Sequence, residues 1–210
     1  QRYDGYHFCP NASGMYNPFS VLLALQKREY GSFWFSTGTP TYLVQLMKEA
    51  DLNPSALSGY EASASELDSI QISVDNPIAV LYQSGYLTIK GYDKELQLYS
   101  LDFPNKEVEE GFIRFLMPMY TAISELDSPS FVGKFVREVR ACKVDDFMKR
   151  LKALMADTPY EIIRDLENHY QNVMYIFTRL MGFYTQAEYH TSCGRIDLLI
   201  ATDKYVYGIE

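Results

Sequence analysis

The C-terminal end of the chain contains an apolar segment with one embedded carboxylate. Residues 196–201 read Ile-Asp-Leu-Leu-Ile-Ala, so Asp197 is the single charge in a run typical of a buried strand. A buried carboxylate is costly unless it meets a cation or hydrogen-bond donors. After a tight turn over 202–204, the alternating segment 205–210 ends in a second carboxylate, Glu210. The sequence therefore predicts a β-hairpin that carries two acids.

The register of this hairpin decides whether its two acids share a face. If Ala201 pairs with Lys204, the loop has two residues and the acids are diagonal neighbours on one face. If Ala201 pairs with Val206, the loop has four residues and the acids lie directly opposite, with Cβ atoms about 5 Å apart. A three-residue loop places them on opposite faces. Either same-face register suits a hard divalent cation bound by carboxylate oxygens.

A third acid, Glu167, belongs to a helix predicted over 159–181. The apolar residues of this helix recur at the helical period: Ile163, Leu166, Tyr170, Val173, Met174, Phe177, Leu180 and Met181. Glu167 lies four residues after Ile163 and three before Tyr170, so it projects from the buried face or its edge. A helix packed on the hairpin would direct Glu167 towards the other two acids. Each acid alone is more typical of a solvated surface, but their order along helix, strand and strand is more specific.

The rest of the chain predicts a helix-rich, mixed α/β fold in two parts, residues 1–104 and 105–210. Asn-Pro or Thr-Pro pairs begin helices at 17–18, 39–40, 76–77 and 158–159, because proline is tolerated at the first helical position. In the first part, residues 55–69 are predicted as a loop, and strands at 86–90 and 96–101 flank a turn over 91–94. A helix followed by such a hairpin resembles a winged-helix unit. We interpret this unit as a packing module, and DNA binding is the alternative.

The second part is predicted to contain helices first and strands last. Asn105 is expected to cap its first helix. The expected helices cover 106–126, 130–156 and 159–181, and the expected strands cover 184–191, 195–201 and 204–210.

Charge and cysteine usage restrict the function classes. The 27 acidic and 19 basic side chains give a net charge of −8, which argues against a simple basic coat for nucleic acid. A local basic groove is still compatible with this charge, and residues 130–152 contain seven basic side chains: Lys134, Arg137, Arg140, Lys143, Lys149, Arg150 and Lys152. They indicate either nucleic-acid contact or the solvated face of an amphipathic helix. Cys9, Cys142 and Cys193 have no metal-binding spacing, which favours a reducing cytoplasm, and no membrane span is predicted.

Two groups of residues resemble a known family. The C-terminal group consists of Glu167-Asn168-His169-Tyr170, Gly194-Arg195-Ile196-Asp197-Leu198 and Tyr205-Val206-Tyr207-Gly208-Ile209-Glu210. It is similar to the PD-(D/E)XK nuclease superfamily, as found at the C-terminus of bacterial proteins with an AAA-ATPase-like region. The upstream segments 3–6, 16–20, 33–41 and 82–87 resemble the end of that ATPase-like region.

The resemblance implies a metal-dependent nuclease in which Asp197, Glu210 and Glu167 hold Mg²⁺ or Mn²⁺. The motif's lysine falls two residues after the second acid and therefore lies beyond Glu210, so the chain as given is expected to be inactive. No G-x-x-x-x-G-K-[ST] pattern occurs, and no nucleotide site is expected in this segment. Nucleic acid and the ATPase module of the same chain are the expected partners. The chain begins without methionine and ends inside a strand-like pattern, which predicts a piece of a longer protein. The alternative is a non-catalytic interaction or regulatory module on a nuclease-like scaffold.

Overall fold

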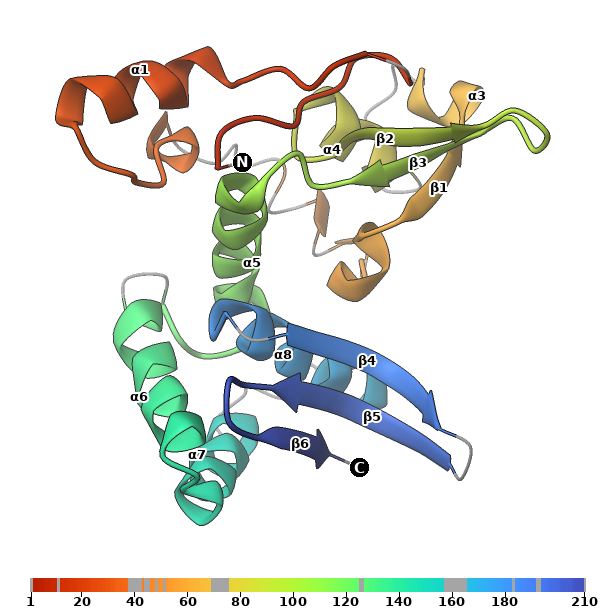
Figure 1. Ribbon diagram of the computed structural model, residues 1–210. Coiled ribbons are helices and arrows are strands. Elements are labelled where there is room, and N and C mark those ends of the chain that lie inside the picture. Colours follow the sequence, from red (N-terminus) through yellow and green to blue (C-terminus); the bar gives the residue numbers. More distant parts are fainter. Residues whose placement is uncertain are drawn as a thin grey trace. The chain divides into compact units, whose positions relative to one another are not determined.

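In the computed structural model, the chain folds into two units, residues 1–112 and 113–210, and the boundary lies within helix α5 (Lys106–Tyr120). The structure describes residues 2–10, 12–37, 43, 46–47, 49–50, 52–68, 76–124, 127–156, 166–182, 184–191 and 194–209. Side chains are described for these residues except 36–37, 166–168, 184–191, 194–200 and 209. Mixed α/β architecture confirms the predicted fold class (Figure 1). The helix starts expected at 39–40 and 158–159 lie outside the described residues.

Three asparagine caps begin helices where the sequence predicts them. The side-chain oxygens of Asn17, Asn76 and Asn105 each accept a hydrogen bond from the backbone N–H three residues later, at 3.1–3.2 Å. Such a bond satisfies one of the N–H groups that the first helical turn leaves unpaired. The helices that follow are α1 (Pro18–Lys27), α4 (Pro77–Gln83) and α5.

The first unit is built around a three-stranded antiparallel sheet of order β1-β3-β2. Its strands are β1 (Tyr60–Ser63), β2 (Thr88–Asp93) and β3 (Leu98–Asp102). The short helices η1 (Trp34–Thr37), η2 (Pro54–Leu57) and α3 (Ala64–Leu67) complete the unit. The predicted loop over 55–69 is wrong for residues 55–68, because this segment forms η2, β1 and α3. β1 pairs with β3 from Tyr60↔Leu101 to Ser63↔Leu98, and Ala62 is fully buried.

The predicted turn over 91–94 is also wrong, since β2 continues to Asp93 and the turn occupies 94–97. A register irregularity between Ile89 and Gly91 adds Lys90 to β2 as an extra residue. The Lys90 ammonium donates hydrogen bonds to the carbonyls of Gly5 and Pro104, at 3.1 and 3.0 Å. Partial burial lowers the pKa of Lys90. The bulge therefore directs this side chain onto neighbouring backbone and shifts the hairpin turn.

Glu107 occupies the first turn of α5, where an acid is favoured by the helix dipole. Its side chain is buried (1% exposed), and Oε1 accepts hydrogen bonds from the backbone N–H groups of Phe33 and Trp34. One carboxylate thus holds the start of η1 against α5 within the first unit. The helical position is visible in the sequence, but the contact to residues more than seventy positions away is not.

Replacing Glu107 with alanine is expected to lower the free energy of unfolding of the first unit by about 2–3 kcal/mol, because two backbone N–H groups lose a charged acceptor. Trp34, the single tryptophan of the chain, lies beside this contact, so its fluorescence during urea unfolding reports the change. Glu110→Ala is the matched control, because Glu110 is exposed on the same helix. Equal stability of the two variants would contradict the structural role of Glu107.

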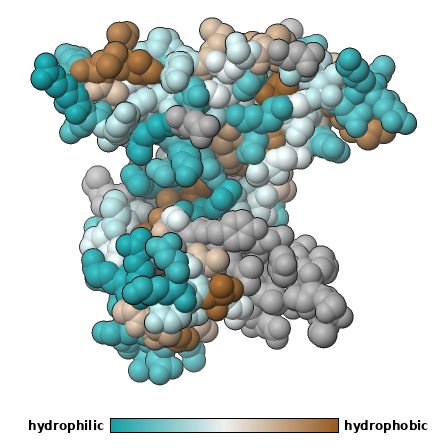
Figure 2. Space-filling model, viewed as in Figure 1, coloured by the Kyte–Doolittle hydropathy of each residue, from teal (hydrophilic) through white to brown (hydrophobic). Residues whose placement is uncertain are grey.

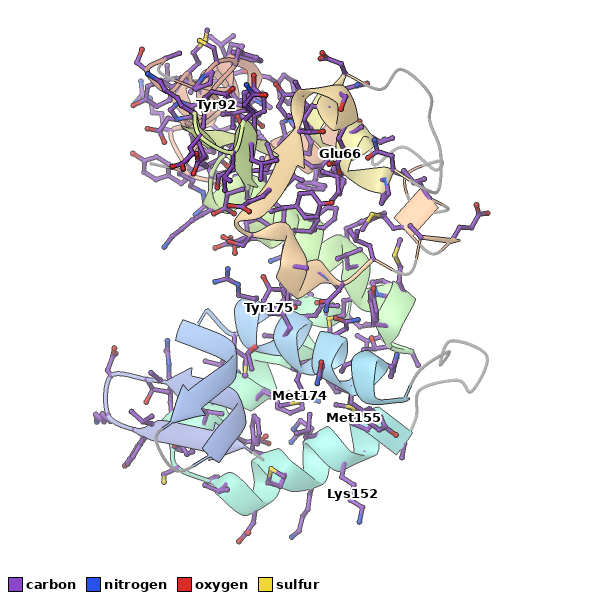
Figure 3. All side chains as sticks on the ribbon, turned by 90° about the vertical axis from the view of Figure 1, so that its right-hand side faces the viewer. Glu66, Tyr92, Lys152, Met155, Met174 and Tyr175 are labelled. Carbon is purple, nitrogen blue, oxygen red and sulfur yellow. The ribbon has the colours of Figure 1, made fainter. Side chains whose placement is uncertain are left out.

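The second unit combines a helical layer with an antiparallel sheet of order β4-β5-β6. Its helices are the end of α5, α6 (Ser128–Arg140), α7 (Val144–Ala156) and α8 (Leu166–Leu180). Its strands are β4 (Tyr184–Thr191), β5 (Gly194–Ala201) and β6 (Val206–Ile209). α8 lies along β4, and Figure 3 places Met174 of α8 and Met155 of α7 between these two helices.

The helix predicted over 130–156 is wrong in one respect, because it is divided into α6 and α7. Cys142 adopts a left-handed conformation (φ 55°) directly after α6. The Lys143 N–H bonds to the Glu138 carbonyl at 2.9 Å, and the Cys142 N–H bonds to the Val139 carbonyl at 3.1 Å. This is the Schellman pattern of helix ends, which usually has glycine at the left-handed position. Because this residue is cysteine and not glycine, the sequence did not indicate that the helix ends there.

Candidate functional site

The hairpin of β5 and β6 has the register of a four-residue loop. Ala201 pairs with Val206, and the ladder continues to Leu198↔Ile209. Thr202 closes the loop, because its hydroxyl oxygen accepts a hydrogen bond from the Tyr205 N–H at 2.9 Å and its N–H donates to the Tyr205 carbonyl at 2.8 Å. Of the registers considered from the sequence, the structure therefore has the one with Ala201 opposite Val206.

The three predicted site residues lie on or next to the described elements. Asp197 belongs to β5 and directly precedes Leu198, the first residue of β5 that pairs with a described residue of β6. Glu167 is in the first turn of α8. For Asp197 and Glu167 the structure describes the backbone only. Glu210 lies outside the described residues. Figure 1 shows α8 behind the sheet, with β5 as the central strand between β4 and β6.

The register of β4 adds an acid that the sequence analysis did not select. Ala187 pairs with Leu198, and Tyr189 pairs with Ile196. The position between these pairs places Glu188 opposite Asp197. Glu188 lies in a polar segment without an apolar run around it, so periodicity could not distinguish it from a surface residue.

His169 is buried on α8 (5% exposed), and the ring stacks against Tyr120 with centroids 6.2 Å apart. Burial lowers the pKa of this histidine, which favours the neutral imidazole. The sequence did not predict His169 as a ligand, and its contact with Tyr120 is that of a packed side chain.

Within the residues whose side chains are described, no group of three His, Cys, Asp or Glu side chains has the arrangement of a metal site. The described part of the chain also has no helix with the length and apolar character needed to cross a membrane. Cys9 and Cys142 are exposed and free, and Cys193 lies outside the described residues.

Comparisons with known proteins relate the end of the chain to a nuclease superfamily. Residues 165–210 match the family model described as the PD-(D/E)XK nuclease superfamily. This range contains α8 and all three strands of the second sheet, and it confirms the resemblance of this region. A relative from Azotobacter chroococcum mcd 1, named "Uncharacterized protein in vnfD 5'region", is 31% identical over an alignment of 219 residues, gaps included, which covers 99% of this chain. The chain spans 41% of that relative's length. No solved structure matches.

Proposed function

We propose that residues 105–210 form a helical segment that leads into a PD-(D/E)XK nuclease core, and that the whole protein hydrolyses phosphodiester bonds with Mg²⁺ or Mn²⁺. The observation that carries this proposal is the superfamily match over 165–210, which contains Glu167, Asp197 and Glu210 in the expected order of elements. The arrangement of α8 along an antiparallel three-stranded sheet supports the proposal.

The three acids are proposed to bind the metal ion. We propose that the register continues by one more pair, which would bring Glu210 opposite Asp197 at the spacing of about 5 Å between Cβ atoms that direct cross-strand partners have. Carboxylate oxygens are the ligands that Mg²⁺ prefers, so this donor set fits the ion. A bound Mg²⁺ would supply Lewis-acid stabilisation of the phosphate and an acidified water. The motif's lysine would follow two residues after Glu210.

A linkage of this nuclease-like region to an AAA-ATPase-like module, in a cytoplasmic protein, is part of the proposal. The upstream segments that resemble an AAA-ATPase-like region support a linkage to such a module. The chain spans 41% of the Azotobacter relative's length. The activity and partners of the whole protein are part of the same proposal.

The first unit is proposed to contain a winged-helix-like module that serves in packing. The order η2, β1, α3, α4, β2, β3 and the sheet order β1-β3-β2 support the winged-helix description. Four consecutive residues of α4, Ile78 to Leu81, are each at most 6% exposed. A helix buried on so many sides has little free surface for a DNA groove, so this module is the less suitable place for DNA.

Titration of Mg²⁺ or Mn²⁺ into the protein continued past Glu210 is expected to show binding that Asp197→Ala abolishes. The physical reason is that removing one of three carboxylates removes both a ligand and a charge that attracts the cation. Isothermal titration calorimetry measures the binding directly. Asp203→Ala is the matched control, because Asp203 is an exposed acid in the loop of the same hairpin.

Two results would contradict the metal site. One is the absence of metal binding to the folded longer protein. The other is an equal loss of binding in Asp197→Ala and Asp203→Ala, which would indicate general attraction to an acidic surface. Either result would favour the alternative proposal, a non-catalytic interaction or regulatory module on a nuclease-like scaffold.

A further inference from the structure

A cavity of about 370 Å³ opens between α6 and α7 in the second unit. The basic side chains around it are Lys134 and Arg137 from α6, Lys143 from the turn and Arg150 from α7. The acids around it are Glu138 and Asp146. Lys134, Arg137 and Lys143 are exposed. The break at Cys142 creates this cavity, because it folds one predicted basic helix into two helices that face each other.

One acid of the cavity is already neutralised by a fixed partner. The Arg150 Nε donates to both carboxylate oxygens of Glu138, at 2.9 and 3.1 Å, and Nη2 donates to Oε1. Glu138 is 8% exposed, and the Arg150 guanidinium lies 5.8 Å from the centre of the Phe135 ring. The ion pair therefore leaves this side of the cavity without net charge. Lys134, Arg137 and Lys143 remain around the cavity against Asp146 alone, which leaves an excess of positive charge.

We propose that this cavity binds a backbone phosphate of a nucleic acid. Lysine and arginine side chains on two sides of an open cavity match the charge and the hydrogen-bond acceptors of a phosphate group. Backbone phosphates position a nucleic acid without reading its sequence. The surface over α6 and α7 carries a cluster of hydrophilic side chains (Figure 2), as a solvated polyanion requires.

The location of the cavity favours a nucleic acid over a free phosphate ion, and here the inference rests on the proposed nuclease function. The Tyr207 hydroxyl of β6 donates a hydrogen bond to the Val139 carbonyl at 2.9 Å, next to the turn that contains Lys143. β6 continues from Tyr207 to Ile209, which pairs with Leu198, the neighbour of Asp197 on β5, and two residues span about 7 Å along a strand. A strand of nucleic acid bound at the proposed metal site would therefore reach the cavity within a few nucleotides.

The test compares two double variants of the 210-residue chain that remove the same charge. Lys134→Gln with Lys143→Gln changes the cavity. Lys149→Gln with Lys152→Gln changes exposed lysines of α7 that do not line it, and Lys152 extends from α7 away from α8 (Figure 3). Fluorescence anisotropy of a labelled oligonucleotide of about 20 nucleotides measures binding. Low salt strengthens the contacts with phosphate, and EDTA removes divalent cations. Oligonucleotide binding is therefore measured without metal and is independent of the metal titration.

The cavity variant is expected to raise the dissociation constant at least about tenfold, while the control changes it by less than about threefold. The dependence of log K on log salt should become shallower by about one in the cavity variant. Circular dichroism is used to check that both variants fold like the unmodified chain. Equal weakening in both variants would overturn the proposal, since it would reveal attraction to overall charge, and so would absence of binding by the unmodified chain.

A competition experiment with inorganic phosphate distinguishes a nucleic-acid backbone from a free phosphate ion as the ligand of the cavity. At constant ionic strength, inorganic phosphate should displace the oligonucleotide only weakly, because it can occupy one site of a longer contact. Inorganic phosphate that binds the cavity in calorimetry while the oligonucleotide does not bind would overturn the nucleic-acid assignment.

Discussion

Replacing Phe177 with alanine is expected to lower the free energy of unfolding of residues 113–210 by about 3–5 kcal/mol. Phe177 is 1% exposed and projects from α8 into an aromatic cluster. Its ring centroid lies 4.7 Å from Phe135 and 5.7 Å from Phe131, both on α6. Phe135 in turn lies 5.3 Å from Phe147 of α7. Removal of the Phe177 ring leaves a cavity where three helices meet.

Urea unfolding followed by far-UV circular dichroism measures this loss. Met148→Ala is the control on α7, because Met148 is 45% exposed and its truncation should cost less than about 0.5 kcal/mol. Trp34 fluorescence reports the first unit separately, so an unchanged fluorescence midpoint shows that the effect is confined to the second. A shift for Phe177→Ala no larger than that for Met148→Ala would contradict the proposed core.

Local signals in the sequence predicted helix starts well, because the interactions behind them are local. Asn17, Asn76 and Asn105 each bond to a backbone N–H only three residues away. The same three-residue spacing can be read from the sequence without knowing the fold. The strands of the second sheet were also predicted within about two residues, and β5 in particular is an apolar run bounded by turn residues.

Elements that depend on distant contacts were missed. β1 has a polar sequence, Tyr-Glu-Ala-Ser, and it exists because β3 provides a ladder about forty residues away. The left-handed Cys142 ends α6 although glycine is the residue that signals such an end. In both cases tertiary packing overrides local propensity, and the second case determines where the basic residues of α6 and α7 lie.

The candidate site was predictable in its elements but not in its register. Asp197 is conspicuous because it is the single charge in an apolar run. The loop length that sets its cross-strand partner depends on Thr202, whose side chain and backbone both bond to Tyr205. Glu188 acquires its place opposite Asp197 only through the pairing of β4 with β5. Whether Glu167 and Glu210 approach Asp197 stays a prediction.

Asp197→Asn is expected to reduce DNA or RNA cleavage at least about a thousandfold in the protein continued past Glu210. The asparagine keeps the size of the side chain and removes the charge. Metal coordination contributes several kcal/mol to stabilising the transition state, and about 4 kcal/mol corresponds to a thousandfold in rate. Single-turnover cleavage of labelled single- and double-stranded substrates with Mg²⁺ measures the rate and identifies the preferred substrate.

Asp203→Asn is the matched control, because Asp203 is an exposed acid in the hairpin loop and loses the same charge. It should retain cleavage within about threefold, whereas Glu210→Gln should resemble Asp197→Asn. Cleavage that survives Asp197→Asn would exclude Asp197 from the active site. The unmodified longer protein could also bind metal and cleave no substrate. That result would separate the metal site from catalysis and favour the scaffold alternative. The same carboxylates can hold a cation without a lysine placed to act on the phosphate.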